Sequence, residues 1–285
     1  MNRRHTRGAC NVLLTLILLL GMTQLSVPED GEAPKNPWRE LAKGLDLGQF
    51  KVNESTVAGD STIVILRIDP AEWELKLVSA SEMEEPRGMT AKQWCAKYDL
   101  VAAINAGMFQ KDYRTHVGFM KSRTHTNSAH RVKYLSAAAF DPLRQGLPLF
   151  RIFDLDQDEF DSVTARYGSV IQNIRMINRK RENRWSDQPK KWSEVALGED
   201  DAGRALFIFC RSPYRMIDFD RILLSLPIGL VCAQHLEGGP EASLYLRWGE
   251  EEIELSGSYE TLFTENDNNH LSWPVPNIIG VARKK

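Results

Sequence analysis

The sequence predicts an α+β domain built from mixed and antiparallel sheets with a few packed helices. Many short runs of β-branched and other apolar residues end at Gly, Pro, Asn or Asp, a pattern typical of strands joined by turns. Only two segments have helical spacing, and they do not alternate with the strands as repeated βαβ units would. The chain has 285 residues, of which 42% are hydrophobic, so it is long enough to bury a large core.

The N-terminus has the pattern of an export signal. Three arginines within the first seven residues precede an almost unbroken apolar run over residues 12–20. That run is shorter than the ~18 residues of a clear transmembrane helix, and no A-x-A cleavage pattern follows it. We therefore expect a signal peptide or an N-terminal membrane anchor over residues 1–23.

The rest of the chain divides into a short linker and one domain. Residues 24–37 are rich in proline and charge, which predicts a linker, and residues 38–285 are expected to form a single domain. The protein is then exported, to the periplasm or the extracellular space. Any membrane association is expected to run through the N-terminal apolar segment.

Apolar or alternating runs predict the strands in chain order. Residues 61–68 and 73–78 are separated by Asp69-Pro70 and are expected to form a β-hairpin. Three further hairpins are expected, at residues 134–140 with 149–153, 195–197 with 205–210, and 243–248 with 252–255. Single strands are expected at residues 100–104, 230–236 and 278–281.

Two segments predict helices. Residues 89–97 have helical character, and Thr90 is placed to cap the first turn. Residues 216–226 carry apolar side chains at helical spacing and end at Pro227 and Gly229.

Charge and cysteine content narrow the class of protein. The formal net charge of −2 shows no basic excess of the kind that nucleic-acid binding needs, so no nucleic-acid partner is expected. Beyond the apolar N-terminus lie three cysteines, Cys95, Cys210 and Cys232. A single bridge between Cys210 and Cys232 and a set of three buried thiols fit this count equally well.

Two strand-to-turn segments carry the candidate site. In residues 101–109 (VAAINAGMF) a buried strand delivers Asn105 to a turn, and in residues 235–246 (HLEGGPEASLYL) a strand delivers Glu237 to Gly238-Gly239. Paired glycines let a ligand approach the backbone N–H groups. A carboxylate at the end of a strand is held rigidly at the edge of a pocket. The alternative for both residues is an ordinary turn position without function.

Taken in this order, these segments resemble the phosphodiester glycosidase family. Residues 104–109 (INAGMF) are similar to the family's INGGFF segment and residues 194–198 (EVALG) to its R-T-A-I-G segment. Residues 236–243 (LEGGPEAS) are similar to L-D-G-G-G-S-S, and residues 275–277 to a closing V-P strand. The resemblance spans roughly residues 60–283 and implies a phosphodiester-glycosidase-like fold.

The sequence departs from the family pattern at the heart of these motifs. Glu194 stands where the family has Arg, and Glu237 stands where it has Asp. Pro240 and Glu241 replace a glycine and a serine. Two functions fit these departures: a divergent hydrolase, or a non-catalytic carbohydrate-binding or envelope-associated protein on the same fold.

The resemblance implies an exported hydrolase that cleaves a sugar-1-phosphodiester, or a related glycosidic bond in envelope or extracellular polysaccharide. Such a site must stabilise an oxocarbenium-like transition state, place a water and hold a phosphate. We assign the catalytic carboxylate to Glu237. Glu241 is a second carboxylate that would share acid and base roles with it, and Asn105 would orient substrate hydroxyls or water.

Contacts with the substrate or its phosphate are expected from both turns and from a nearby polar stretch. They are assigned to Gly107, Gly238, Gly239, Glu194, His116 and Arg123. A mobile basic loop is the alternative for the stretch that holds the last two. No metal and no cofactor are expected, because the histidines lack the H-E-x-x-H spacing and the acidic residues 154–158 fail the calcium-loop pattern.

Overall fold

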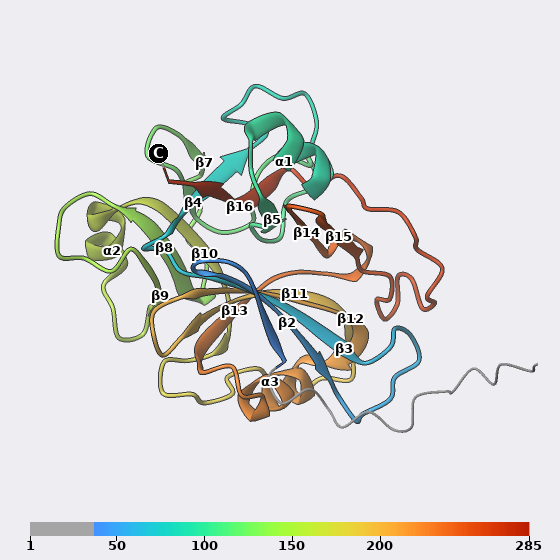
Figure 1. Cartoon of the computed structure of the whole chain (residues 1–285). Coiled ribbons are helices and arrows are strands. Elements are labelled where there is room, and N and C mark those ends of the chain that lie inside the picture. Colours follow the sequence, from blue (N-terminus) through green and yellow to red (C-terminus); the bar gives the residue numbers. More distant parts are fainter. Residues whose placement is uncertain (1–36, 285) are drawn as a thin grey trace, which may run out of the picture. The chain divides into compact units, whose positions relative to one another are not determined.

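The computed structural model describes residues 37–284, and residues Asn36–Lys285 form one compact unit (Figure 1). The expected signal peptide or anchor, and all but the last residue of the expected linker, lie outside the described residues. Both assignments therefore stay predictions. Within residues 37–284, no helix combines the length and the apolar character needed to cross a membrane.

Two antiparallel sheets make up most of this unit, with three α-helices packed on them. The α+β class is thus confirmed, although sheet dominates and every strand pairing in residues 37–284 is antiparallel. The large sheet contains eleven strands: β1 (Trp38–Ala42), β2 (Leu45–Lys51), β3 (Thr62–Ile68), β12 (Ala205–Arg215), β11 (Lys191–Asp200), β13 (Leu230–Gly238), β10 (Tyr167–Ile177), β6 (Met120–Lys121) and β7 (Thr126–Ser128), with β8 (Leu135–Pro142) joining β10 to β9 (Phe150–Asp154). The small sheet contains five, in the order β15 (Glu251–Ser256), β14 (Ser243–Trp248), β5 (Ala102–Asn105), β16 (Asn277–Arg283) and β4 (Trp73–Ser79).

The main core lies between the two sheets. Apolar side chains from both sheets form one cluster, which includes Leu66, Leu197, Phe207, Ile104, Leu244 and Ile279. Helix α3 (Met216–Ser225) packs on the outer face of the large sheet, and α1 (Ala91–Tyr98) packs on the outer face of the small sheet (Figure 1). Helix α2 (Phe160–Arg166) covers β8 and β10. Both faces of each sheet are therefore largely buried.

The first expected hairpin is wrong. Strand β3 pairs with β2 and β12 in the large sheet, whereas β4 pairs with β16 in the small sheet. The turn between them, in which Asp69 accepts backbone hydrogen bonds from Glu72 and Trp73 at 3.0 Å, carries the chain from one sheet to the other. Strand β3 is apolar on both faces, and β4 alternates apolar residues with Glu74 and Lys76, but neither local pattern shows which partner the strand takes.

The other three hairpins and both helices are confirmed. Strands β8–β9, β11–β12 and β14–β15 pair as expected. In α1, the Thr90 hydroxyl accepts from the Gln93 amide at 3.2 Å, and the Gln93 side chain accepts from the Thr90 amide at 3.0 Å, forming a complete capping box.

Strand β10 is the longest element without a sequence prediction. Its polar residues are nevertheless buried: the Gln172 side chain bonds to the Val132 backbone, and Arg175 pairs with Asp154 and Asp156. A polar strand of this kind has no apolar alternation to reveal it. Strands β1 and β2, the two-to-three-residue strands β6 and β7, and helix α2 also had no prediction.

The three cysteines beyond the apolar N-terminus are thiols, and the alternative bridge between Cys210 and Cys232 is absent. Cys95, Cys210 and Cys232 are all free and buried. The last two lie on β12 and β13, which are separated in the sheet by β11. Burial raises the pKa of Cys95 to about 12, so this thiol is inert at neutral pH.

Candidate active site

The LEGGPE segment connects the two sheets. Strand β13 ends at Gly238, the 3₁₀ turn η1 (Gly239–Glu241) follows, and β14 then starts in the small sheet. The Asn105 side chain at the end of β5 holds this turn, because its Oδ1 accepts from the Ser243 amide at 2.8 Å and the Ser243 hydroxyl at 3.0 Å. Its Nδ2 donates to the Glu241 carbonyl at 3.0 Å. The two predicted segments therefore do meet in space.

Asn105 itself is not placed to touch a substrate. Asn105 is only 1% exposed, and its amide oxygen and its Nδ2 already form hydrogen bonds with the turn. The structure thus favours a positioning role, in which the β5 end holds Glu241 and Ser243 in place.

Glu237 is the penultimate residue of β13 and is partly exposed. Its Oε1 accepts from the Gly238 amide at 3.1 Å. Burial raises the pKa of Glu237 to about 8, the charges of Glu241 and Glu194 add to that shift, and His235 opposes it. At neutral pH the carboxyl is therefore mainly protonated, which is the state of a general acid.

A buried ion pair lies two residues earlier on the same strand. His235 Nδ1 is 2.7 Å from Glu194 Oε1, and the Trp192 indole donates to Glu194 Oε2 at 2.6 Å. Burial would lower the pKa of His235, but Glu194, Glu237 and Asp220 together outweigh it, so this pKa is raised. Burial also raises the pKa of Glu194, so the pair holds a proton at neutral pH.

A β-bulge separates this pair from Glu237. Val195 lies opposite Glu237 and Ala196 lies opposite His235, so Leu236 is an extra residue on β13. Leu236 belongs to the core between the sheets. Bulges of this kind re-aim side chains next to functional sites.

Aromatic rings and a second buried acid surround His235. The rings of Trp185 and Trp192 have centroids 5.7 and 6.0 Å from the imidazole. There is no room for a side chain at position 238, because a Cβ on Gly238 would collide with the Trp192 ring. Asp220 on α3 is fully buried with both carboxyl oxygens unpartnered, and burial raises its pKa to about 8.

Acids rather than cations border the paired glycines. Gly239 has φ +67°, and a Cβ there would lie 2.6 Å from Glu260 Oε2. The carboxyls of Glu237, Glu241 and Glu260 gather at this turn, and each has its pKa raised chiefly by burial. The arrangement favours proton transfer over the binding of a phosphate by the glycine backbone.

The first turn is packed rather than open. Gly107 is buried, and a Cβ on it would lie 2.5 Å from His116 Cε1. His116 is fully buried, its Nε2 bonds to the Gln172 carbonyl at 2.9 Å, and burial lowers its pKa to about 4. At neutral pH this histidine is uncharged, so it offers no cation to a phosphate.

Arg123 lies at another cavity. Its Nε donates to Asp141 Oδ2 at 2.9 Å, and both residues line a cavity of about 460 Å³ together with Glu82, Ser122 and Thr124. Glu241 lines a different cavity, and neither Arg123 nor Asp141 is part of the lining of that cavity. The polar stretch of residues 114–131 therefore does not converge on the glycine turn.

Glu241 lines a separate cavity of about 430 Å³. Sequence reasoning missed most of its lining, which consists of Pro86, Arg87, Gly88, Asp112, Tyr113, Trp273, Pro274 and Pro276. Arg87 and Trp273 stand beside proline or glycine in surface loops, and an aromatic or cationic residue in such a loop is a signal for binding.

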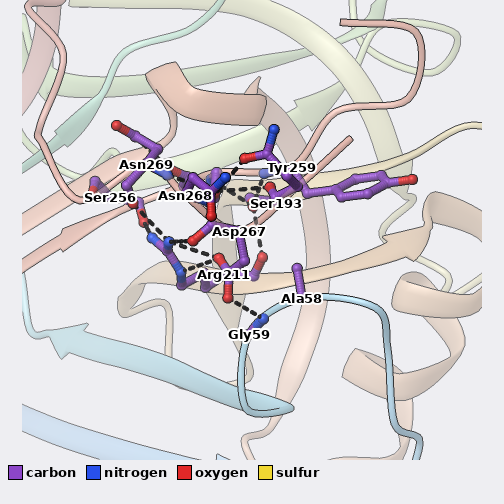
Figure 2. A network of polar contacts seen from close by, with 12 residues as sticks. Ala58, Gly59, Ser193, Arg211, Ser256, Tyr259, Asp267, Asn268 and Asn269 are labelled. Carbon is purple, nitrogen blue, oxygen red and sulfur yellow. Dashed lines mark hydrogen bonds and ion pairs between the residues drawn. The ribbon is translucent and has the colours of Figure 1, made fainter. Parts of the chain in front are cut away.

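A long segment, residues 257–276, forms one wall of this region and is tied down by Arg211 (Figure 2). Arg211 pairs with Asp267 at 2.7 Å and donates to the carbonyls of Ser256 at 2.6 Å and Asn269 at 2.7 Å. The Ser193 hydroxyl accepts from the Tyr259 amide at 3.2 Å. This network holds the segment that carries both Glu260 and Trp273.

The sequence-predicted residues thus fall into three groups. Glu237, Glu241, Gly238 and Gly239 come together at the turn, Asn105 and Glu194 support them from buried positions, and Gly107, His116 and Arg123 lie in other surroundings. Within residues 37–284, no group of three or more His, Cys, Asp or Glu side chains is arranged to hold a metal ion.

Comparisons with known proteins show a family and a shared fold. The sequence profile of the phosphodiester glycosidases matches residues 98–282. A hypothetical protein from Synechocystis has a similar structure, with a TM-score of 0.61 and 14% identity, over 90% of this chain and 65% of that chain. The catalytic domain of zebrafish N-acetylglucosamine-1-phosphodiester alpha-N-acetylglucosaminidase, auto-inhibited by its pro-peptide, is similar at a TM-score of 0.59 and 11% identity, over 85% of this chain and 84% of that domain. No curated protein sequence matches the chain.

The family profile spans more than half of the chain, including the β5 end, the Glu194–His235 pair and the LEGGPE turn. The protein therefore belongs to the phosphodiester glycosidase family, a family of glycosidase-like hydrolases.

Proposed function

We propose that the protein is an exported hydrolase that cleaves a sugar-1-phosphodiester, or a related glycosidic bond in envelope or extracellular polysaccharide. The observation that carries this proposal is the partly exposed residue Glu237, whose carboxyl has its pKa raised to about 8 by burial, at the sheet end where the family motifs meet. The family match and the substrate named for the zebrafish relative support the substrate class.

Two carboxyls with different surroundings divide the chemistry. Glu237 holds its proton at neutral pH and donates it to the departing phosphate oxygen as the C1–O bond breaks. Glu241 accepts the proton of the water that attacks C1. Burial raises the pKa of Glu241 above its ordinary value, which makes its carboxylate a stronger base.

The buried His235–Glu194 pair tunes Glu237. The charge on His235 opposes the upward shift of the Glu237 pKa, and the charge on Glu194 adds to it. Because Glu194 is 1% exposed and already bonded to His235 and Trp192, it acts through these neighbours rather than on the substrate. This use of the position explains how a glutamate replaces the family's arginine without leaving an unpaired buried charge.

The test uses a chromogenic sugar phosphodiester and three proteins. The wild type should release the chromophore, and Glu237→Gln should lose about 10²- to 10⁴-fold in kcat, the usual value of a general acid. Glu250→Gln is the matched control, because Glu250 is exposed and lies outside the turn. Equal turnover by Glu237→Gln and the wild type would rule out the assigned acid.

A non-catalytic carbohydrate-binding protein is the second candidate. The aromatic lining of the cavity at Glu241 favours it, because Tyr113 and Trp273 offer binding surface without chemistry. Tight sugar binding by the wild type without any turnover would select this function.

Export is part of the proposal and rests on the pattern of residues 1–23. Fractionation of cells that express the tagged full chain, or the chain without residues 1–23, tests it. The full chain should reach the envelope or medium, and the shortened chain should stay inside.

A further inference from the structure

We propose that the cavity at Glu241 is the subsite for the sugar phosphate, with Trp273 and Tyr113 holding the pyranose ring and Arg87 holding the phosphate. This inference rests on the proposed function and assigns its substrate contacts. It replaces two phosphate contacts that the sequence predicted. The glycine backbone is bordered by acids, and Arg123 is paired with Asp141.

The size and position of the cavity fit one sugar unit beside the acids. Its volume is about 430 Å³, within the range of small-molecule sites. Glu241 lies on its wall, and the Glu241 carbonyl is held by the Asn105 amide at 3.0 Å. Glu237 lies just before the 3₁₀ turn η1, which ends at Glu241. A ligand in this cavity therefore lies against Glu241, at the turn that Glu237 precedes.

Two aromatic side chains form part of the wall, and the Tyr113 ring packs against Phe109 with centroids 5.5 Å apart. Tyr113 is 63% exposed and has φ +54°, a left-handed conformation that a bulky residue adopts only at a strain cost. Trp273 is partly exposed and, within residues 37–284, makes no aromatic or hydrogen-bonded contact. Exposed aromatic rings facing a cavity are suited to pack on the C–H faces of a pyranose.

Arg87 is the free cation of this cavity. It is exposed, and within the described part of the chain it forms neither an ion pair nor a hydrogen bond. Its counterparts Arg123 and Arg131, by contrast, are paired with Asp141 and Asp161. A free guanidinium binds a phosphate through two parallel N–H donors.

The walls that carry Arg87 and Trp273 are joined to each other. The backbones of Met89 and Val275 exchange hydrogen bonds at 3.3 and 3.0 Å, and the Trp94 indole donates to the Val275 carbonyl at 2.9 Å. Gly88 packs so closely on this strand that a Cβ would lie 2.5 Å from the Val275 carbonyl oxygen. The cavity is therefore largely pre-formed, which lowers the entropic cost of binding.

The inference is tested by measuring how a panel of hexose 1-phosphates, and the matching free hexoses, bind to the full chain. Calorimetry and tryptophan fluorescence measure the binding. Arg87→Ala should weaken sugar-phosphate binding by about 10- to 100-fold, the effect of a lost charged hydrogen bond, and leave free-sugar binding unchanged. Trp273→Ala should weaken both ligands by about tenfold or more, and Trp273→Phe should restore part of the loss. Arg144→Ala, at an exposed arginine of another loop, is the control and should bind as the wild type does.

The outcomes separate this inference from the proposed function. Hexose phosphate binding that is lost in Arg87→Ala and Trp273→Ala, without turnover by the wild type, keeps the subsite and rejects the hydrolase. Turnover that depends on Glu237 but is unchanged in both cavity variants keeps the hydrolase and rejects the subsite. A wild-type protein that binds no member of the panel also overturns the subsite. Unchanged far-UV circular dichroism shows that each variant is folded.

Discussion

His235 Nδ1 lies 2.7 Å from Glu194 Oε1 inside the large sheet, two residues before the carboxyl of Glu237. The pair is 5% and 1% exposed, so neither charge is solvated by water. Loss of one partner leaves an uncompensated charge in an apolar setting, which costs more than the net contribution of the pair itself. The pair therefore makes the end of β13 both rigid and electrostatically defined.

Truncation of Glu194 should destabilise the fold strongly. Glu194→Ala is expected to lower the free energy of unfolding by about 3–5 kcal/mol, as for other broken buried pairs. Urea titration measures this change. Arg39→Ala, which removes an exposed pair with Glu251, should cost under about 1 kcal/mol. A similar loss of unfolding free energy in the two variants would show that the buried pair contributes no more to stability than an exposed one.

The pH dependence of activity should follow Glu237. Its pKa is raised to about 8, and the acid must carry its proton, so kcat should fall as the pH rises through about 8. In Glu237→Gln this limb should be absent from the residual activity. Glu237→Asp should keep more activity than Glu237→Gln, because a carboxyl remains. A rate that climbs steadily above pH 8 would contradict the acid role.

Asp220 should make stability depend on pH. Its folded pKa of about 8 lies above the ordinary value of 3.8, so its contribution is fully present below about pH 4 and is lost as the pH rises through about 8. Asp220→Asn removes that loss. The variant should therefore gain stability over the wild type as the pH rises from 4 to 8, by about 1.4 kcal/mol per unit at most.

Thermal unfolding of the two proteins at pH 5 and pH 8.5 measures this difference. Asp158→Asn is the control, because Asp158 lies in a surface turn far along the chain from α3. An equal difference in Tm at both pH values would show that Asp220 is ionised throughout.

Asn105 should matter through the turn it holds. Asn105→Ala leaves the Ser243 amide and the Glu241 carbonyl without these partners, which costs about 1–3 kcal/mol for each buried group. Activity should fall because Glu241 moves. Hydrogen exchange at the Ser243 amide, together with kcat, measures both effects. Asn105→Ala with an unaltered Ser243 exchange rate would mean that the turn is held by other contacts.

Arg211 should control the order of residues 257–276. Its guanidinium bonds to the Asp267 carboxylate and to three backbone carbonyls, and the other carboxylate oxygen of Asp267 accepts from the Gly59 amide at 2.9 Å (Figure 2). Arg211→Ala should therefore speed proteolysis and hydrogen exchange in this segment. It should also weaken any binding at Trp273. Arg221→Ala, which removes an exposed helix pair with Asp218, should change neither.

Local patterns determined the elements that a short stretch of sequence can specify. The Thr90 capping box, helix α3 and three hairpins follow from residues within a few positions of one another. The INAGMF and LEGGPE segments likewise indicated the family, which the sequence profile confirms, and they led to the prediction of a catalytic carboxyl at Glu237.

Long-range packing decided the rest. Whether β3 turns back on β4 depends on partners more than a hundred residues away, and the apolar faces of both strands look alike in the sequence. The pairing of Glu194 with His235, the burial of Asn105 and the neutral state of His116 arise from neighbours brought by other strands. A residue's charge and exposure are properties of its surroundings, so only the tertiary structure could assign the acids to the turn and Arg87 with Trp273 to the cavity.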